Sequence, residues 1–295
     1  MQTPWSDIAV ADAHTHFFSR RFFDALASET GQDAAAVAAR LGWELPPEDP
    51  TALAGRWAAE LDKQDVARAA LIASVPGDEF SVLAAAAAFP DRFYAYAMVN
   101  PLRPGATVER GLNAICLFPA MHKYSVQDAR VEPLLEQAAA LHCAVFVHCG
   151  TLTLGVRKKL GLPCPFDMRF SNPLDLHAVA QRHAGVRFIV PHFGAGYFRE
   201  ALMLADLCPN VYLDTSSSNS WMRYEGLSLT TVFQRALEVA GPQRLLFGTD
   251  SSFFPRGWID AVFQEEARAL LKLGVGVDDA RLILGENLAR VLEGA

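Results

Sequence analysis

The sequence lacks features that mark several other classes of protein. Its five cysteines are odd in number and include no C-x-x-C pair, so we expect a reducing compartment, the cytoplasm, rather than a disulfide framework. No basic segment followed by an apolar stretch opens the chain, so no secretory signal peptide is predicted. The most apolar run, residues 83–89, is too short to span a bilayer, and no membrane association is expected.

Clustered positive charge is also scarce. The net charge is −7, and basic residues adjoin one another no further than the run 157–159, so the sequence gives no reason to expect a nucleic-acid partner. Hydrophobic residues make up 51% of the chain and charged residues 20%, which is the composition of a globular protein with a large core. Extended disorder is therefore not expected.

The sequence does contain a regular alternation of two kinds of segment. Short runs rich in Val, Ile, Leu and Phe alternate with Ala-rich segments of helical period, the pattern of successive strand–helix units. Eight such runs are predicted as strands: 8–13, 67–75, 93–99, 114–118, 144–147, 186–190, 211–213 and 245–247. Eight parallel strands are accommodated by an α/β fold, the (β/α)8 TIM barrel, in which every strand edge is paired. An open doubly wound sheet is the alternative, but no G-x-G-x-x-G follows the first strand.

The segment between the first two strands, residues 17–65, is longer than a simple crossover. It contains two stretches of helical pattern, 33–41 and 51–61, on either side of a proline-rich turn. Long connections of this kind are often lids over a functional site, and decoration of the barrel is the other interpretation. No linker composition marks a boundary, so we predict one domain over residues 1–295 with a helical insertion between strands one and two.

Ionisable side chains follow four of the predicted strands. His14 and His16 end the first strand, His148 the fifth, His192 the sixth and Asp250 the eighth. Because the carboxyl ends of all strands meet on one face of a barrel, these residues are expected in one small volume. Taken singly, such a histidine is more often a hydrogen-bonded core or surface residue, and an Asp after Gly-Thr often caps a helix. Coincidence on four strands at once favours a metal site.

This set of donors suits one kind of ion. Residues two apart on a strand share a side, so His14 and His16 can bind the same ion. Neutral imidazole nitrogens with one carboxylate oxygen favour a borderline divalent cation, Zn²⁺ first, with Mn²⁺, Fe²⁺ or Co²⁺ as alternatives. Three or four protein ligands leave a coordination position open, which is typical of a catalytic rather than a structural metal site.

The same motifs carry a resemblance to a known family. The chain resembles the amidohydrolase superfamily, and within it the amidohydrolase 2 branch that includes aminocarboxymuconate semialdehyde decarboxylase. The resemblance covers nearly the whole chain. It rests on segments 12–16 (DAHTH), 61–69 (LDKQDVARA), 146–150 (FVHCG), 191–194 (PHFG), 246–251 (LFGTDS) and 284–290 (LGENLAR).

The resemblance implies roles for individual residues. It implies four metal ligands: His14, His16, His148 and Asp250. Asp250 would also accept a proton, and His192 would be the acid or base beside the metal. Cys116 stands on the fourth strand where many relatives carry a metal-bridging lysine, which implies one ion rather than two. A thiolate can itself bind a soft ion, but a buried packing residue is the favoured interpretation of Cys116.

The site is compatible with two reactions and with a non-catalytic alternative. In a hydrolase, the metal would activate water toward a small amide, lactone or ester-like substrate, and His192 would protonate the leaving group or stabilise developing charge. In a decarboxylase, the metal would stabilise the electron pair left when CO2 departs from a small unsaturated or aromatic acid. A metal-binding scaffold protein without an exchangeable water is the third class. We favour the hydrolase.

Three further residues are predicted to contact the substrate. His122 follows the fourth strand, and Arg256 and Trp258 lie in the loop after the eighth. This loop combines aromatic surface with a cation, which suits a flat, anionic ligand. The expected partner is a small molecule, carboxylate-bearing if the reaction is decarboxylation, and a homodimer is common in the branch that the chain resembles.

Other segments near the predicted site have two interpretations each. The basic run 157–159 and Arg199 can bind a substrate carboxylate or remain solvated. The hydroxyls of residues 214–221 can hydrogen-bond the substrate or satisfy the backbone groups of a turn.

Overall fold

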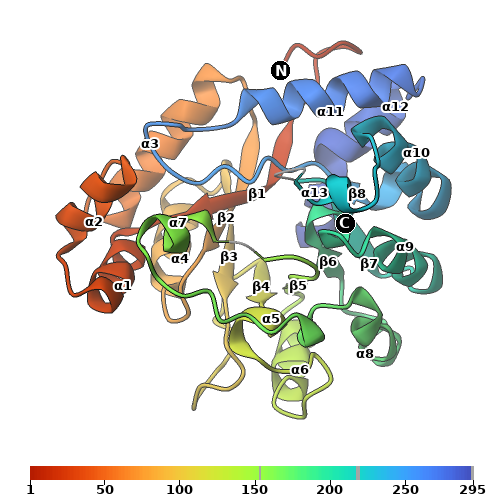
Figure 1. Ribbon diagram of the computed structural model, residues 1–295. Helices are drawn as coiled ribbons and strands as arrows, with labels where there is room; N and C mark the ends of the chain where they lie inside the picture. Colours follow the sequence, from red (N-terminus) through yellow and green to blue (C-terminus); the bar gives the residue numbers. More distant parts are fainter. Residues whose placement is uncertain (153, 217–219, 294–295) are drawn as a thin grey trace.

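Eight parallel strands form a nearly closed barrel in the computed structural model, which describes residues 1–152, 154–216 and 220–293 (Figure 1). The strands are β1 (Ala11–Phe17), β2 (Arg68–Ala73), β3 (Phe93–Met98), β4 (Ala114–Leu117), β5 (Ala144–Val147), β6 (Phe188–Val190), β7 (Val211–Asp214) and β8 (Leu245–Leu246). They follow one another around the barrel in sequence order, and helices lie between them on the outside. The predicted (β/α)8 architecture is confirmed.

The seam between β8 and β1 is closed by individual backbone bonds instead of a regular ladder. The His16 amide donates to the Ser251 carbonyl (2.7 Å), and the Asp250 amide donates to the His14 carbonyl (2.9 Å). Two of the segments predicted to carry the site are therefore direct neighbours along this seam.

Strand β1 extends further than the predicted strand 8–13 and passes both of its histidines. A register shift between Asp12 and Thr15 interrupts its pairing with β2. Shifts of this kind re-aim side chains and occur often beside active sites. His14 and His16 thus lie within the strand, where the ladder holds their backbone, and not in the loop after it.

Alternate residues of the strands fill the barrel interior. They are Ala11, Ala13, Ala70, Ile72, Tyr94, Tyr96, Met98, Ala114, Cys116, Phe118, Ala144, Phe146, Ile189 and Leu246. Most residues between them pack against the helices, so the strands are apolar on both sides and appear in the sequence as hydrophobic runs. Cys116 is fully buried in this interior, and burial raises the pKa of its thiol well above the ordinary value. It has the environment of a packing residue.

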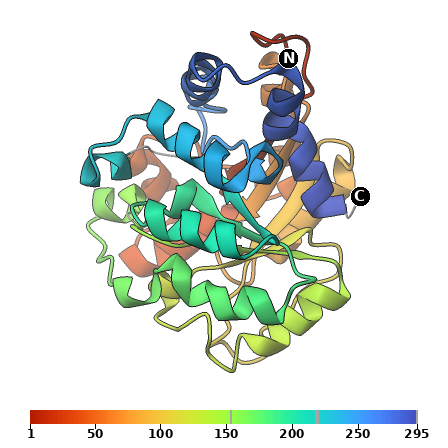
Figure 2. The same cartoon turned by 90° about the vertical axis from the view of Figure 1, so that its right-hand side faces the viewer.

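Helices cover the outside of the barrel. They are α3 (Pro50–Lys63), α4 (Glu79–Ala88), α6 (Glu132–Ala140), α8 (His177–Arg182), α9 (Phe198–Leu207), α10 (Leu229–Ala240), α11 (Asp260–Lys272) and α12 (Val277–Arg281). Two short helices, α5 (Pro119–His122) and α7 (Gly155–Lys159), follow β4 and β5 and contribute Met121 and Val156 to the lining of the cavity described below. The helices of the second half of the chain, green to blue, face the viewer in Figure 2. Among the described residues, no helix is both long and apolar enough to cross a membrane.

The segment between β1 and β2 divides into two parts. Its last helix, α3, packs against α4 as part of the outer ring. The first two, α1 (Arg20–Thr30) and α2 (Ala34–Leu41), stand at one side of the barrel (Figure 1). They share a small core that includes Phe22, Phe23, Leu26, Val37 and Leu41. Leu160, directly after α7, is buried in the same core, so the added helices are joined to the connection between β5 and β6.

The C-terminal helix α13 (Asn287–Glu293) closes the amino ends of the strands, which we call the closed end of the barrel. Three of its side chains join the interior cluster: Leu288, Val291 and Leu292. Around them, Glu293 accepts a hydrogen bond from the Tyr94 hydroxyl (2.7 Å) and pairs with Arg68. The carboxyl ends of the strands, which we call the mouth, remain for the functional site.

Candidate metal centre

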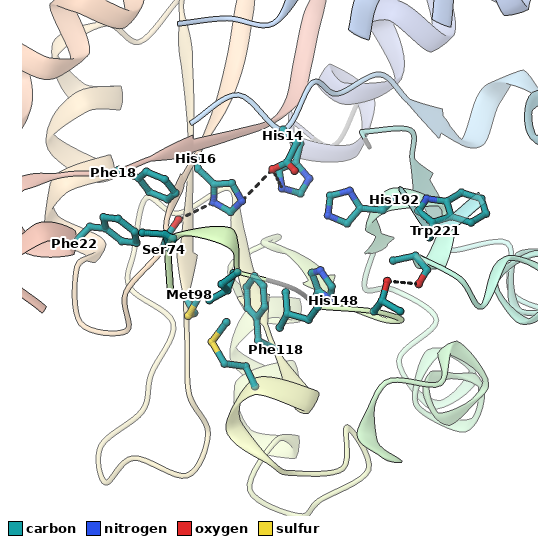
Figure 3. A pocket seen from close by; sticks show the side chains of 17 residues that line it. His14, His16, Phe18, Phe22, Ser74, Met98, Phe118, His148, His192 and Trp221 are labelled. Carbon is teal, nitrogen blue, oxygen red and sulfur yellow. Dashed lines mark hydrogen bonds and ion pairs between the residues drawn. The ribbon is translucent and has the colours of Figure 1, made fainter. Parts of the chain in front are cut away.

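A cavity of about 270 Å³ lies at the mouth of the barrel (Figure 3). All five ionisable residues predicted from the strand ends line it: His14, His16, His148, His192 and Asp250. The other lining residues are Phe18, Phe22, Ser74, Met98, Phe118, Met121, Thr151, Leu152, Leu154, Val156, Ala195 and Trp221. The structure therefore brings the predicted imidazoles and carboxylate together in a hollow whose other walls are mainly apolar.

Three of these side chains come close enough to share one ion. A ring nitrogen of His14, a ring nitrogen of His16 and a carboxylate oxygen of Asp250 all lie within 4.8 Å of one another. Asp250 Oδ1 is 3.3 Å from His16 Nε2 and 3.7 Å from His14 Nε2. Asp250 reaches this position from left-handed backbone, with φ 59°, just after β8. Two imidazoles and one carboxylate are a donor set that fits a divalent transition metal.

Hydrogen bonds on the far side of each ring determine which nitrogen faces the cavity. His14 Nδ1 lies 2.6 Å from Asp214 Oδ2, to which it donates. His16 Nδ1 lies 2.7 Å from the Ser74 hydroxyl, and that hydroxyl donates its own proton to the Ile72 carbonyl (3.2 Å). Ser74 must then accept from His16. In the neutral form of each ring, Nε2 is therefore the unprotonated nitrogen and lies toward Asp250, which is the form that a metal ligand requires.

His148 lies on another wall of the same cavity. Its ring is stacked beside Phe118, with centroids 5.3 Å apart, and meets His192 edge-on at 5.4 Å. It does not belong to the group of donors within 4.8 Å. Its Nδ1 is buried and has no hydrogen-bond partner in the described protein, and burial lowers the pKa of the ring well below the ordinary value. A neutral, unpartnered imidazole at this position fits a further metal ligand.

His192 occupies a tight turn directly after β6. The turn Pro191–Gly194 places His192 (φ 55°) and Phe193 (φ 51°) in left-handed backbone. His192 Nδ1 donates to the Ser216 carbonyl at 2.6 Å, which leaves Nε2 as the free nitrogen of the ring. The Ser216 hydroxyl also lies 2.9 Å from His14 Nδ1, so one residue contacts both histidines. His192 thus has one ring nitrogen without a protein partner beside His14 and His16 (Figure 3), an arrangement that suits proton transfer.

Burial and charge have opposite effects on the titrating groups of the site. Burial lowers the pKa values of His16 and His192, and both rings are neutral near pH 7. At His14 burial also lowers the pKa, but the charge of Asp214 outweighs it and the net shift is upward. Burial raises the pKa of Asp250, yet the close imidazoles, of which His16 Nε2 lies 3.3 Å away, bring it well below the ordinary value. Asp250 is therefore ionised, as cation binding requires.

Trp258 does not have the position that the sequence predicts for it. It is 3% exposed and does not line the cavity. Its indole nitrogen donates to Asp12 Oδ2 (2.8 Å), and its ring packs against Phe263 of α11. Asp12 also accepts from the backbone amides of His14 (2.8 Å) and Thr249 (3.1 Å). Trp258 therefore belongs to a buried network behind the ligands that joins β1 to the residues after β8.

The other two predicted substrate contacts also lie outside the cavity lining. His122 is half-buried at the end of α5, and its neighbour Met121 faces the cavity instead. Arg256 is exposed, donates to the Ser252 hydroxyl (2.6 Å) and lies over the Phe253 ring, 4.4 Å from its centroid. Neither side chain lines the cavity, and their role as substrate contacts stays a prediction.

Three residues orient the histidines: Ser74, Asp214 and Ser216. The sequence interpretation gives Ser74 and Asp214 no role, and it assigns the Ser216 hydroxyl to the substrate or to a turn. Ser74 directly follows β2, and Asp214 ends β7. A polar residue at the carboxyl end of an apolar strand is the signal that identifies the histidines, and it selects these two residues equally well. Within the stretch 214–221, Ser216 contacts histidines and Trp221 lines the cavity, whereas residues 217–219 lie outside the described residues.

The family follows from a comparison of the whole chain. The family model described as amidohydrolase matches residues 11–294. The chain belongs to the amidohydrolase family, as its motifs predict, and the fold of this family is that of metal-dependent enzymes.

A curated relative matches over a shorter stretch. Protein fluG of Emericella nidulans is 34% identical over 85 residues, which is 29% of this chain. The match spans only 10% of the length of that protein. It therefore supports common ancestry of a segment and carries no activity over to the whole chain.

Solved structures match the fold at low identity. The 5-carboxyvanillate decarboxylase LigW from Sphingomonas paucimobilis has a TM-score of 0.64 and 14% identity, with 97% of this chain and 99% of that chain covered. A zinc-bound amidohydrolase from Burkholderia multivorans has a TM-score of 0.61 and 18% identity, with coverage of 96% and 99%. At such identities the likeness establishes the fold and leaves open which reaction this chain catalyses.

Proposed function

We propose that this protein is a metal-dependent hydrolase that cleaves a small amide, lactone or ester-like substrate. The observation that carries the proposal is that two imidazoles, each oriented by a hydrogen bond, lie close to the same carboxylate oxygen. His14 and His16 are each hydrogen-bonded through Nδ1, and their Nε2 atoms lie 3.7 and 3.3 Å from Asp250 Oδ1. These three residues, with His148 as a further ligand, would hold one divalent ion, for which zinc is the first choice.

The metal would supply Lewis-acid polarisation of the substrate oxygen and a lowered pKa for water at neutral pH. The residues of the chain supply the rest. Asp250 is ionised and accepts the proton of the attacking water through its carboxylate. His192 has a free Nε2 and a position fixed by Ser216, so it can hold a proton and deliver it to the leaving group.

A decarboxylase is the second candidate, and one observation favours it. The solved structure of LigW, which shares this fold, is named as a 5-carboxyvanillate decarboxylase. A carboxyvanillate carries acidic groups, and a second acidic group needs a cationic partner in addition to a metal. No Lys or Arg is found among the described residues that line the cavity. We therefore place hydrolysis first.

The test of this proposal measures the metal and both products. Elemental analysis of the purified protein should find about one divalent ion per chain. The metal-loaded protein is then given a panel of lactones, amides, esters and unsaturated or aromatic acids, with acid release and CO2 release followed separately. Metal-dependent acid release supports the hydrolase. CO2 evolution without hydrolysis, or full activity of the metal-free protein, overturns it.

A further inference from the structure

The described lining of the cavity contains polar side chains but no lysine or arginine. Its polar lining residues are the four histidines, Asp250, Ser74 and Thr151, whereas Phe18, Phe22, Met98, Phe118 and Leu152 are among the apolar ones. Residues 153, 217–219 and 294–295, which are not described, include no Lys or Arg either. A negative charge on the substrate away from the metal would therefore have no cationic partner.

The cations nearest to this region have other partners. Arg157 of α7 forms two hydrogen bonds to the Glu29 carboxylate of α1 (2.9 and 2.7 Å). Arg199 pairs with the adjacent Glu200 (2.7 Å). Arg256 donates to the Ser252 hydroxyl outside the cavity. Arg256 also donates to the backbone carbonyl of Asp250 (3.4 Å), so it lies behind a candidate ligand, and none of the three cations lines the cavity.

A second, more open apolar pocket of about 730 Å³ adjoins the first. The two pockets share Thr151, Leu152 and Leu154 as lining residues. Beyond them, the second pocket is lined by side chains that include Met168 and Tyr224, which are 37% and 57% exposed. Large apolar side chains left exposed beside a cavity are typical of ligand contacts. The described cation of this pocket, Lys158, is itself exposed.

We propose that the substrate is uncharged at neutral pH and carries an apolar group that extends from the metal past Leu152 into the second pocket. This inference rests on the proposed function and adds the substrate class to it. A carboxylate placed among Phe22, Met98 and Leu152 would lose its hydration without gaining a partner, which is a large penalty in an apolar site. An alkyl or aryl group gains affinity at the same place through buried area. The cavity thus selects against acids by leaving their charge unpaired.

Binding of matched hydroxamic acids tests the inference without turnover, because a hydroxamate attaches to a metal while its tail samples the walls. Zinc-loaded protein is titrated by calorimetry with butanohydroxamic acid and with succinic monohydroxamic acid, which differ by a terminal carboxylate. We expect the acid to bind at least about 30-fold more weakly. Lengthening the neutral tail to octanohydroxamic acid should tighten binding by up to about fourfold per buried methylene.

Two substitutions separate the pockets. Leu152→Arg introduces a cation into the shared wall and should reverse the preference toward the succinic compound, whereas Leu152→Met keeps the preference of the wild type. Met168→Glu alters an exposed side chain of the second pocket. It should weaken the octanoyl compound and leave the butanoyl compound unchanged. Thermal melting of each variant verifies folding, and Leu154→Arg replaces Leu152→Arg if that variant does not fold.

The outcomes distinguish a failure of this inference from a failure of the proposed hydrolase function. Equal or tighter binding of the succinic compound by the wild type overturns the neutral substrate and leaves the hydrolase intact. Octanoyl binding no tighter than butanoyl binding overturns the extension into the second pocket. If neither short hydroxamate binds zinc-loaded protein, the metal site fails and the substrate class fails with it.

Discussion

The two ends of the barrel differ in how their side chains are paired, although the same strands form both. At the closed end, Leu288, Val291 and Leu292 fill the space between the strands, and Glu293, Tyr94 and Arg68 pair with one another. At the mouth, His14, His16 and His192 are hydrogen-bonded through Nδ1, whereas His148 has no such partner among the described residues, and all four rings line the cavity. The side chains of the closed end pair with one another. Those of the mouth keep polar atoms available for a ligand that the chain does not provide.

This difference teaches where stability and chemistry reside. In barrels of this class the amino ends of the strands mainly support the fold, and the carboxyl ends carry the reaction. Substitutions at the closed end should therefore change the free energy of unfolding and leave metal content alone. Substitutions at the mouth should chiefly lower the metal content.

The largest effect is expected from the double variant His14→Ala/His16→Ala. It removes two of the three converging donors, so bound metal should fall to background and kcat/KM should fall on the order of 10³-fold or more. Elemental analysis and initial rates measure both. Thermal melting in chelator verifies that the variant folds, with a lower melting temperature than the wild type because buried Asp214 loses its partner His14. A variant that retains its metal would contradict the site.

At the closed end, Leu288→Ala should destabilise the fold by about 2–5 kcal/mol, because it leaves a cavity beneath the strands. Leu288 is 2% exposed, whereas Leu271 of α11 is 41% exposed, so Leu271→Ala is the matched control and should cost far less. Urea unfolding gives both values. Metal per folded chain should equal that of the wild type, and a marked loss of metal from Leu288→Ala would break the separation of the two ends.

A smaller effect at the mouth is expected from Asp214→Asn. The carboxylate of Asp214 orients His14 through a 2.6 Å hydrogen bond. Its loss should weaken metal binding by about 10–100-fold without removing any ligand. Competition with a chelator measures the affinity, and the exposed Asp260→Asn serves as the control. Unchanged affinity would assign Asp214 to packing.

The smallest effect concerns the pH dependence of stability. Glu266 of α11 is buried and accepts from the Thr215 hydroxyl (2.7 Å), and burial raises its pKa well above the ordinary value. The folded state keeps the proton that the unfolded chain releases. Wild-type stability from this group is thus complete below the unfolded pKa and is lost as the pH rises toward the folded pKa.

Glu266→Gln has no such proton. Its stability relative to the wild type should therefore increase between pH 5 and pH 8, as measured by urea unfolding at each pH. A constant difference between the two proteins would show that Glu266 is ionised in the folded state.

Much of this molecule was predictable from local pattern. Strand periodicity located all eight strands because both faces of a barrel strand are buried, and β1 differed because a register shift carries it past His16. The five strand-end residues were found because topology fixes where strands end. The positions of the Trp258 and Arg256 side chains were not predicted correctly. Hydrogen bonds to Asp12 and Ser252 set their direction, and the periodicity of the sequence does not encode such contacts.

The turn after β6 has a consequence for the evolution of the protein. His192 and Phe193 adopt left-handed backbone, which costs a residue with a Cβ roughly 1–2 kcal/mol and costs glycine almost nothing. Exchange of His192 for glycine would relieve this backbone cost, but it would also remove the hydrogen bond of the ring to the Ser216 carbonyl and the proton donor that we propose. A histidine retained in this costly backbone conformation is the outcome that selection for the proposed reaction would produce.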